Sequence, residues 1–133
     1  MSEPISEPLN NYQAGVCNIG PSEIRKRRTV AIIGAALSAA GIASYSHNHT
    51  AHLSRIGIFL PLLVFSVGYV QSRKRFCLAF GFMGTFNFGK SREVAQVASP
   101  EDRAFDRKTA LSILAQSAAI ALALTVIVVI LPL

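Results

Sequence analysis

Four stretches of this chain contain no Asp, Glu, Lys or Arg, and two of them are long enough to cross a lipid bilayer. Residues 29–54 and 109–133 run for 26 and 25 residues without a formal charge. A helix that rises 1.5 Å per residue needs about 20 residues to cross a hydrocarbon core of roughly 30 Å. Because lipid offers no partners to backbone N–H and C=O groups, such stretches must fold as helices.

The other two uncharged stretches differ in length. Residues 56–72 run for 17 residues, which is enough if residues 51–54 extend the helix and Arg55 reaches the headgroups. Residues 76–89 number only 14 and are too short to span. We therefore predict an all-α integral membrane protein with three transmembrane helices, over about residues 29–45, 52–71 and 109–131.

The remaining segments follow from this division. Residues 1–20 are predicted to be an irregular cytoplasmic arm, and residues 21–133 a single membrane domain. Ser99, Pro100, Glu101 and Asp102 combine an N-cap residue, a first-turn proline and two acids. This pattern predicts one long helix from about Pro100 to about Leu131, with its first turns outside the lipid.

Composition supports the membrane class. The chain is 51% hydrophobic and 15% charged, with a net charge of +6, whereas soluble domains carry roughly 25% charged residues. Twelve of the 13 Lys and Arg residues lie on one side of the membrane if the N-terminus is inside. Because positive charge favours the cytoplasmic side, we expect a multi-pass protein of the cell (inner) membrane, with a cytoplasmic N-terminus and an outer C-terminus.

Two groups of basic residues precede the first span and follow the second. Next to spans they are expected to bind anionic lipid headgroups rather than nucleic acid. They are Arg25, Lys26, Arg27 and Arg28 in the first group, and Arg73, Lys74 and Arg75 in the second.

Small residues dominate the first span. Small side chains let helix backbones approach closely, so this face is predicted to dock on another helix, within the chain, in a partner subunit or in a second copy. The predicted contact residues are Gly34, Ala35, Ser38, Ala39, Gly41 and Ala43. In the third span, Gln116 is expected either to bond a neighbouring helix or to lie near enough to the inner interface to reach water.

Five of the eight Phe residues lie in residues 76–89. Their spacing fits a helix and a strand equally, so periodicity does not decide between the two. The segment is expected at the cytoplasmic interface, either as an anchor for the second helix or as an apolar platform for a lipid, a quinone-like ligand or a partner subunit. The residues concerned are Phe76, Phe80, Phe82, Phe86 and Phe88.

Two sets of residues could carry metal or redox chemistry. His47, His49 and His52 in the outer connection offer three imidazoles to a metal such as Zn, Cu or Ni, or else form a polar turn at headgroup level. Cys17 and Cys77 both lie on the cytoplasmic side near basic residues that would favour thiolate. That compartment usually keeps thiols reduced, and no C-x-x-C motif is present.

Motifs for catalysis are absent from the sequence, which has no Walker loop, no G-x-G-x-x-G and no H-E-x-x-H. Apart from Arg55 and the three His residues, which are at possible interface positions, the spans also lack the embedded ionisable residue that ion-coupled transporters usually carry. We therefore expect a protein that is not an enzyme and that serves as an accessory or assembly subunit of a larger membrane complex. The alternative is a small metal- or thiol-redox-handling membrane protein that uses the His cluster or the cysteines. The sequence assigns no cofactor.

Overall fold

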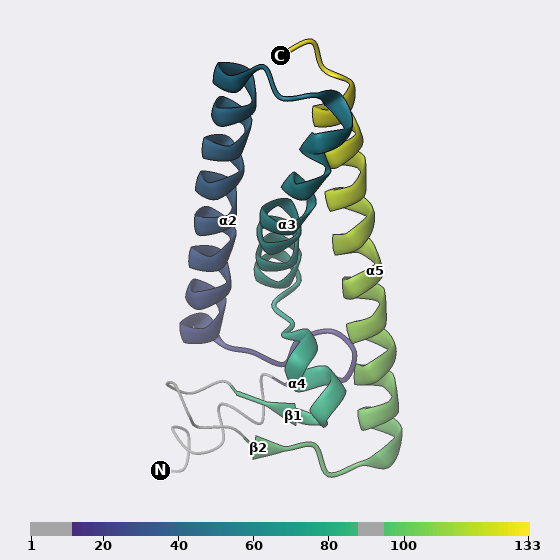
Figure 1. Ribbon diagram of the computed structural model, residues 1–133. Helices are drawn as coiled ribbons and strands as arrows, with labels where there is room; N and C mark the ends of the chain where they lie inside the picture. Colours follow the sequence, from purple (N-terminus) through teal and green to yellow (C-terminus); the bar gives the residue numbers. More distant parts are fainter. Residues whose placement is uncertain (1–11, 88–94) are drawn as a thin grey trace.

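The computed structural model describes residues 12–87 and 95–133, and three long apolar helices make up most of it (Figure 1). Helix α2 spans Pro21–Asn48, the 3-10 helix η1 (His52–Ile58) leads into α3 (Phe59–Lys74), and α5 spans Pro100–Ile130. α2, the continuous His52–Lys74 segment and α5 are each long and apolar enough to cross a membrane. The predicted fold class, with three membrane-spanning helices, is therefore confirmed.

The predicted start of the long C-terminal helix is also confirmed. Ser99 is the N-cap of α5, and its Oγ accepts a hydrogen bond from the Asp102 backbone N–H at 3.3 Å. Pro100 occupies the first turn, where its missing N–H removes no helical bond. α2 and α5 begin well before their uncharged stretches, so both helices project beyond the lipid at the same end of the molecule. We call that end, which carries Pro21, Lys74 and Pro100, the basal end, and the opposite one the distal end.

Helix α3 lies between the other two long helices and packs against both (Figure 1). Two buried apolar clusters fill the contact between α3 and α5. The one toward the distal end joins Ile58 and Leu62 to Ala121 and Val128. The basal cluster consists of Val70, Phe76, Ala110 and Ile113. α2 contacts α3 closely but α5 hardly at all, so much of its surface remains open.

The contact between α2 and α3 depends on a glycine from each helix. A Cβ atom added at Gly34 would lie 2.7 Å from Cα of Phe65, and one added at Gly68 would lie 2.6 Å from the backbone N of Ala31. Real Cβ atoms do not approach backbone atoms so closely, so any side chain here must push the helices apart. Small residues thus set the distance between α2 and α3, as is common in membranes.

Substituting Gly34 by alanine tests this contact. We expect Gly34→Ala to lower the thermal unfolding midpoint in mild detergent, at a cost of about 1–3 kcal/mol, because the added methyl overpacks a backbone contact. Gly57→Ala is the matched control, since a Cβ there meets only Tyr45 Oη at 3.9 Å. Equal midpoints for the two variants would show that the Gly34 contact does not hold the helices together.

A short cap of mixed structure covers the basal end beneath α3. It consists of helix α4 (Leu78–Met83), strand β1 (Thr85–Phe86) and strand β2 (Ala95–Gln96), with β1 and β2 antiparallel and Thr85 opposite Gln96. The Phe-rich segment therefore contains both a helical turn and a strand. This explains why its spacing fitted both periods equally well.

The sequence suggested that Arg55 reaches outward to the headgroups. Instead its side chain is directed into the protein, and the residue is only 2% exposed. Its Nη1 donates to the carbonyl oxygens of Leu131 at 2.6 Å and Val128 at 3.0 Å, and its Nε donates to the Thr50 carbonyl at 3.2 Å. The last carbonyls of a helix have no partners within it and favour a cation. Arg55 therefore caps the distal end of α5 from a neighbouring element.

Candidate functional site

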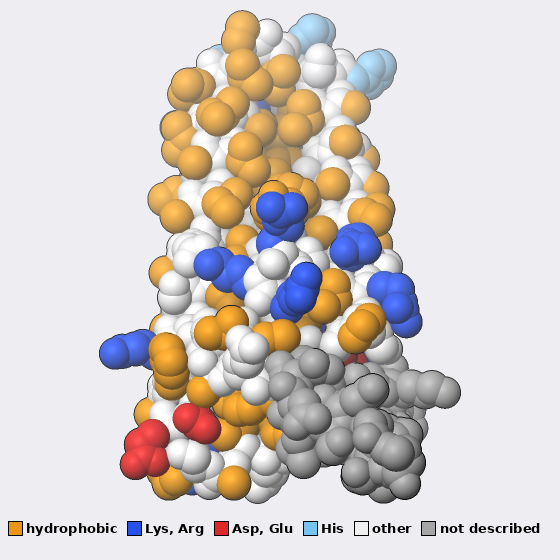
Figure 2. Space-filling view, turned by 180° about the vertical axis from the view of Figure 1, so that it is seen from behind, with side chains coloured by type: hydrophobic (Ala, Val, Ile, Leu, Met, Phe, Trp, Pro, Cys, Tyr) orange, Lys and Arg blue, Asp and Glu red, His pale blue; other side chains and the backbone are white. Residues whose placement is uncertain are grey.

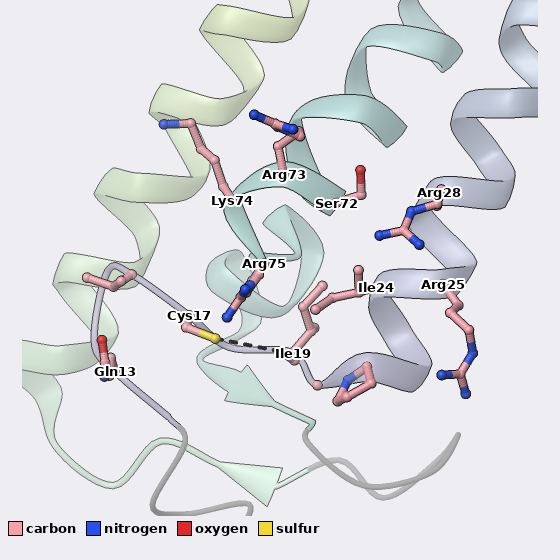
Figure 3. Close-up of a pocket in the computed structure, with 13 residues that line it drawn as sticks. Gln13, Cys17, Ile19, Ile24, Arg25, Arg28, Ser72, Arg73, Lys74 and Arg75 are labelled. Carbon is pink, nitrogen blue, oxygen red and sulfur yellow. Dashed lines mark hydrogen bonds between the residues drawn. The ribbon is translucent and has the colours of Figure 1, made fainter.

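A cavity of about 1010 Å³ opens at the basal end between α2, the end of α3 and the N-terminal segment (Figure 3). Arg25 and Arg28 come to it from α2, and Ser72 from the last turn of α3. The side chain of Arg28 extends from α2 toward Ser72 (Figure 3). The remaining basic residues of the lining follow Ser72 directly along the chain, and they are Arg73, Lys74 and Arg75.

The charge of this cavity is uniformly positive. Its lining contains five basic residues and no acidic one. Among the residues that the structure describes, the only acidic side chain in an ion pair is Glu23, which pairs with Lys26 and Arg27 at 3.1 and 3.2 Å. Lys26 and Arg27 do not line the cavity. The five lining cations therefore have no carboxylate partner within the described part of the chain.

A second, apolar groove continues from the cavity toward the middle of the spans. It has a volume of about 370 Å³ and shares Arg28, Ser72 and Arg73 with the cavity. Its walls are the stacked rings of Phe65 and Tyr69, 5.8 Å apart, on α3 and a row of small and aliphatic side chains on α2. That row consists of Ala31, Ile32 and Ala35.

The N-terminal segment forms the floor of the cavity and is held by Asn18. This side chain is completely buried, accepts a hydrogen bond from the Cys77 backbone N–H at 2.7 Å and donates to the Cys77 carbonyl at 3.2 Å. The backbone N–H of Asn18 donates to the Arg75 carbonyl, and Ile19 pairs with Asn87 in a parallel bridge. Residues 12–20 are thus irregular, as predicted, but they are docked into the basal end.

Asp106 on α5 fixes the other part of this segment. Its carboxylate is fully buried and accepts hydrogen bonds from the Tyr12 hydroxyl and the Gly15 backbone N–H, both at 2.6 Å. Thr109, one turn along α5, donates to the Gly15 carbonyl at 2.8 Å. Burial and the neighbouring Asp106 carboxylate raise the pKa of Tyr12, so its hydroxyl remains a hydrogen-bond donor at physiological pH.

The sequence did not single out Asn18, Asp106 or Gln71 as structural residues. Gln71 is buried at the end of α3, and its side-chain oxygen accepts a hydrogen bond from the Leu78 backbone N–H at 2.9 Å. Asp106 lies on the same helical face as the buried residues Ala110 and Ile113. That spacing was a usable signal for its burial, whereas nothing local distinguishes Asn18 from other asparagines of the N-terminal segment.

The predicted small-residue contact divides between two faces of α2. Gly34 and Ser38 are buried and Gly41 is half-buried, which places these three residues on the side that faces α3 and η1. Ala35, Ala39 and Ala43 are exposed. The first set therefore packs within the chain, and the second is not covered by any described element.

The Phe-rich segment also divides. Phe76 is fully buried and Phe86 is 3% exposed, so these two belong to the interior of the basal cap and cannot form an exposed platform. The reason is that α5 and the N-terminal segment cover them: Phe76 packs with Ala110 and Ile113, and Phe86 stacks on Tyr12 at 4.9 Å. Phe80 is half-buried and Phe82 is exposed, while Phe88 lies outside the described residues.

The structure gives no geometric support to a three-imidazole metal site. Within the described residues no group of three His, Cys, Asp or Glu side chains is arranged to hold a metal ion. His47 ends α2, His49 follows it in a left-handed conformation, and the ring of His52 is hydrogen-bonded to the Val129 carbonyl. The His side chains lie at the distal end, opposite the basic cavity (Figure 2).

Cys17 and Cys77 lie on adjacent segments at the basal end, both with free thiols. Arg27 donates to Cys77 Sγ at 2.9 Å. Cys17 lines the cavity, and burial raises the pKa of its thiol above the ordinary value even though Arg75 acts in the opposite direction. The expected thiolate character of Cys17 is therefore wrong, because loss of solvent outweighs the nearby positive charge.

The raised pKa of Cys17 predicts its alkylation behaviour. A raised pKa lowers the thiolate fraction at any pH below it, so iodoacetamide should modify folded Cys17 more slowly at pH 8 than the chain unfolded in SDS. The folded rate should keep rising at pH values where the unfolded rate has levelled off. Peptide mapping by mass spectrometry after short pulses measures both rates. A folded pH profile that coincides with the unfolded one would contradict the raised pKa.

Comparisons of the chain with protein-family models, with curated proteins and with solved structures find no match. The class of protein consequently rests on the fold. Three long apolar helices with a basal cap of short elements define a mostly helical, multi-pass membrane protein whose helices contact lipid. Its described part carries the basic cavity with the adjoining apolar groove at the basal end.

Proposed function

We propose that this protein is a non-catalytic accessory or assembly subunit, which packs its exposed helix surfaces against other subunits of a membrane complex. The observation that carries this proposal is a polar pair on the outer surface of α5. Gln116 donates from its side-chain nitrogen to Ser112 Oγ at 3.0 Å, and both residues are exposed.

The pair lies deep within the uncharged stretch of α5, where water is not expected to reach it. Gln116 lies eight residues beyond Lys108, the last charged residue of the chain, which corresponds to about 12 Å along the helix axis. Gln116 retains a second N–H and a carbonyl oxygen that the Ser112 bond does not use. Lipid chains cannot satisfy these groups, whereas a neighbouring transmembrane helix can. Of the two alternatives for Gln116, this geometry favours a helix partner.

The outward face of α2 supports the same conclusion. Ala35, Ala39 and Ala43 are exposed and recur every four residues, so they present a row of small side chains on which a second helix could pack closely. Only 17% of the apolar window of α2 is buried within the chain. A large surface of this helix is thus available to partner subunits or to lipid.

Replacing the polar group of Gln116 tests the proposal. Wild-type protein, solubilised from its native membrane in mild detergent, should migrate on native electrophoresis in a band that contains other proteins. Gln116→Leu should weaken this association about 3- to 20-fold, the equivalent of one interhelical hydrogen bond. The matched control is Leu114→Ala on the other exposed flank of α5, which should leave the band unchanged.

Two results would contradict the proposal. One is migration only as a free monomer or as an assembly of this chain alone. The other is an equal loss of the larger band in Gln116→Leu and Leu114→Ala, since this would indicate general damage to α5 rather than loss of a specific polar contact.

We further propose that the basal end faces the cytoplasm and the distal end faces outward, in the cell (inner) membrane. The distribution of positive charge supports this orientation, because Arg55 is the only Lys or Arg between residues 29 and 72. A reporter that is active only outside the cytoplasm should therefore be active when fused after Leu133 and inactive when fused before Met1. The reverse pattern would overturn the orientation.

A further inference from the structure

We infer that the basic cavity and the apolar groove together form a binding site for one anionic phospholipid, with its phosphate in the cavity and an acyl chain in the groove. The inference goes beyond general attraction of basic residues to a membrane surface, because it assigns a bound lipid to a defined site. It does not depend on the accessory role proposed above.

The charge of the cavity suits an anionic headgroup. Five basic residues line one cavity of about 1010 Å³ whose lining holds no acid; two of them lie on α2, two in the last turn of α3 and one directly after α3. Like charges held together repel one another, and a multiply charged anion bound among them relieves this repulsion. Guanidinium groups are well suited to phosphate, since their N–H donors match its oxygens in pairs.

The ends of the uncharged stretches indicate the level of the cavity in the membrane. On α2 the charge-free stretch begins directly after Arg28, and on α3 it ends directly before Arg73. These two residues and Ser72 are shared by the cavity and the groove. The junction of the two spaces therefore lies where both helices pass from lipid into water, which is the level of phospholipid headgroups. Figure 2 shows Lys and Arg side chains gathered below the apolar part of the surface.

The apolar groove distinguishes a lipid from a free phosphate. It extends from the cavity toward the bilayer interior between the Phe65 and Tyr69 rings and the side chains of Ala31 and Ala35. A soluble anion would occupy only the cavity and would leave the apolar groove empty. A phospholipid fills both parts at once, since its charged head and its chains meet at the level where the cavity meets the groove.

Other basic residues at the basal end are not part of the site. Arg107 and Lys108 on α5 are exposed and line neither the cavity nor the groove. They can attract anionic lipid through charge alone. Neutralising Arg107 and Lys108 therefore removes the same amount of charge as neutralising two lining residues, but leaves the cavity and the groove unchanged.

The experiment is a lipid titration of the full-length purified protein, read by native mass spectrometry in mild detergent. Phosphatidylglycerol and phosphatidylcholine with identical chains are added in parallel, and inorganic phosphate and glycerol phosphate are added as soluble competitors. We expect one phosphatidylglycerol molecule to bind saturably and at least tenfold more tightly than phosphatidylcholine. Glycerol phosphate at equal concentration should not displace it.

Two pairs of variants locate the site. Arg28→Gln with Arg73→Gln should weaken phosphatidylglycerol binding at least tenfold, whereas Arg107→Gln with Lys108→Gln should weaken it less than twofold. Ala35→Leu fills the groove without changing charge and should also weaken binding. Ala39→Leu, one turn further along the same exposed face and outside the groove, should not.

Three outcomes would overturn the inference. Equal losses in the two double variants would mean that binding depends only on total charge. Displacement of the lipid by glycerol phosphate or inorganic phosphate at equal concentration would mean that the cavity binds a soluble anion. Equal binding by Ala35→Leu and wild type would remove the groove from the site. If Arg28→Gln with Arg73→Gln does not fold, as judged by circular dichroism, the comparison of Ala35→Leu with Ala39→Leu decides.

Discussion

The close approach of α2 and α3 at Gly34 and Gly68 is the contact on which the rest of the structure depends. Backbone touches backbone there, so the distance between the two helices leaves no room for adjustment. This contact fixes Arg28 on one helix opposite Ser72 and Arg73 on the other, and thereby creates both the basic cavity and the groove above it. Lipid chains are as apolar as the helix surfaces, so the hydrophobic effect does not drive helices together within a bilayer. Tight packing of this kind is therefore a main source of helix association.

The basal end is organised by a different kind of interaction. Outside the lipid the chain turns through α4 and the short strands, and many backbone groups there lack helical partners. Buried polar side chains supply those partners: Asn18 bonds both backbone groups of Cys77, Gln71 bonds the N–H of Leu78, and Asp106 bonds Gly15 and Tyr12. A buried polar group is tolerated only when its hydrogen bonds are made. The N-terminal segment therefore docks in one defined position and closes the floor of the cavity.

The two proposals concern different surfaces. The exposed Gln116 and the alanine face of α2 are the surfaces proposed to contact other helices within the bilayer, whereas the cavity at Arg28 and Arg73 is the surface proposed to hold a headgroup at the bilayer edge. The groove brings the two surfaces near each other, since Ala35 belongs both to its lining and to the alanine face. A lipid bound there would lie beside any helix that packed on this part of α2.

The amino-acid sequence was enough to predict the three spans, the N-cap of α5 at Ser99, and spans that hold no formal charge other than Arg55. These are properties of consecutive residues, because the bilayer acts on each stretch separately through its length and charge. The tertiary structure alone decided that Phe76 is interior, that Arg55 caps α5 and that the basic residues enclose a cavity. Each of these results joins distant parts of the chain, as in the Asn18–Cys77 contact across 59 residues, and side-chain type alone does not encode such neighbours.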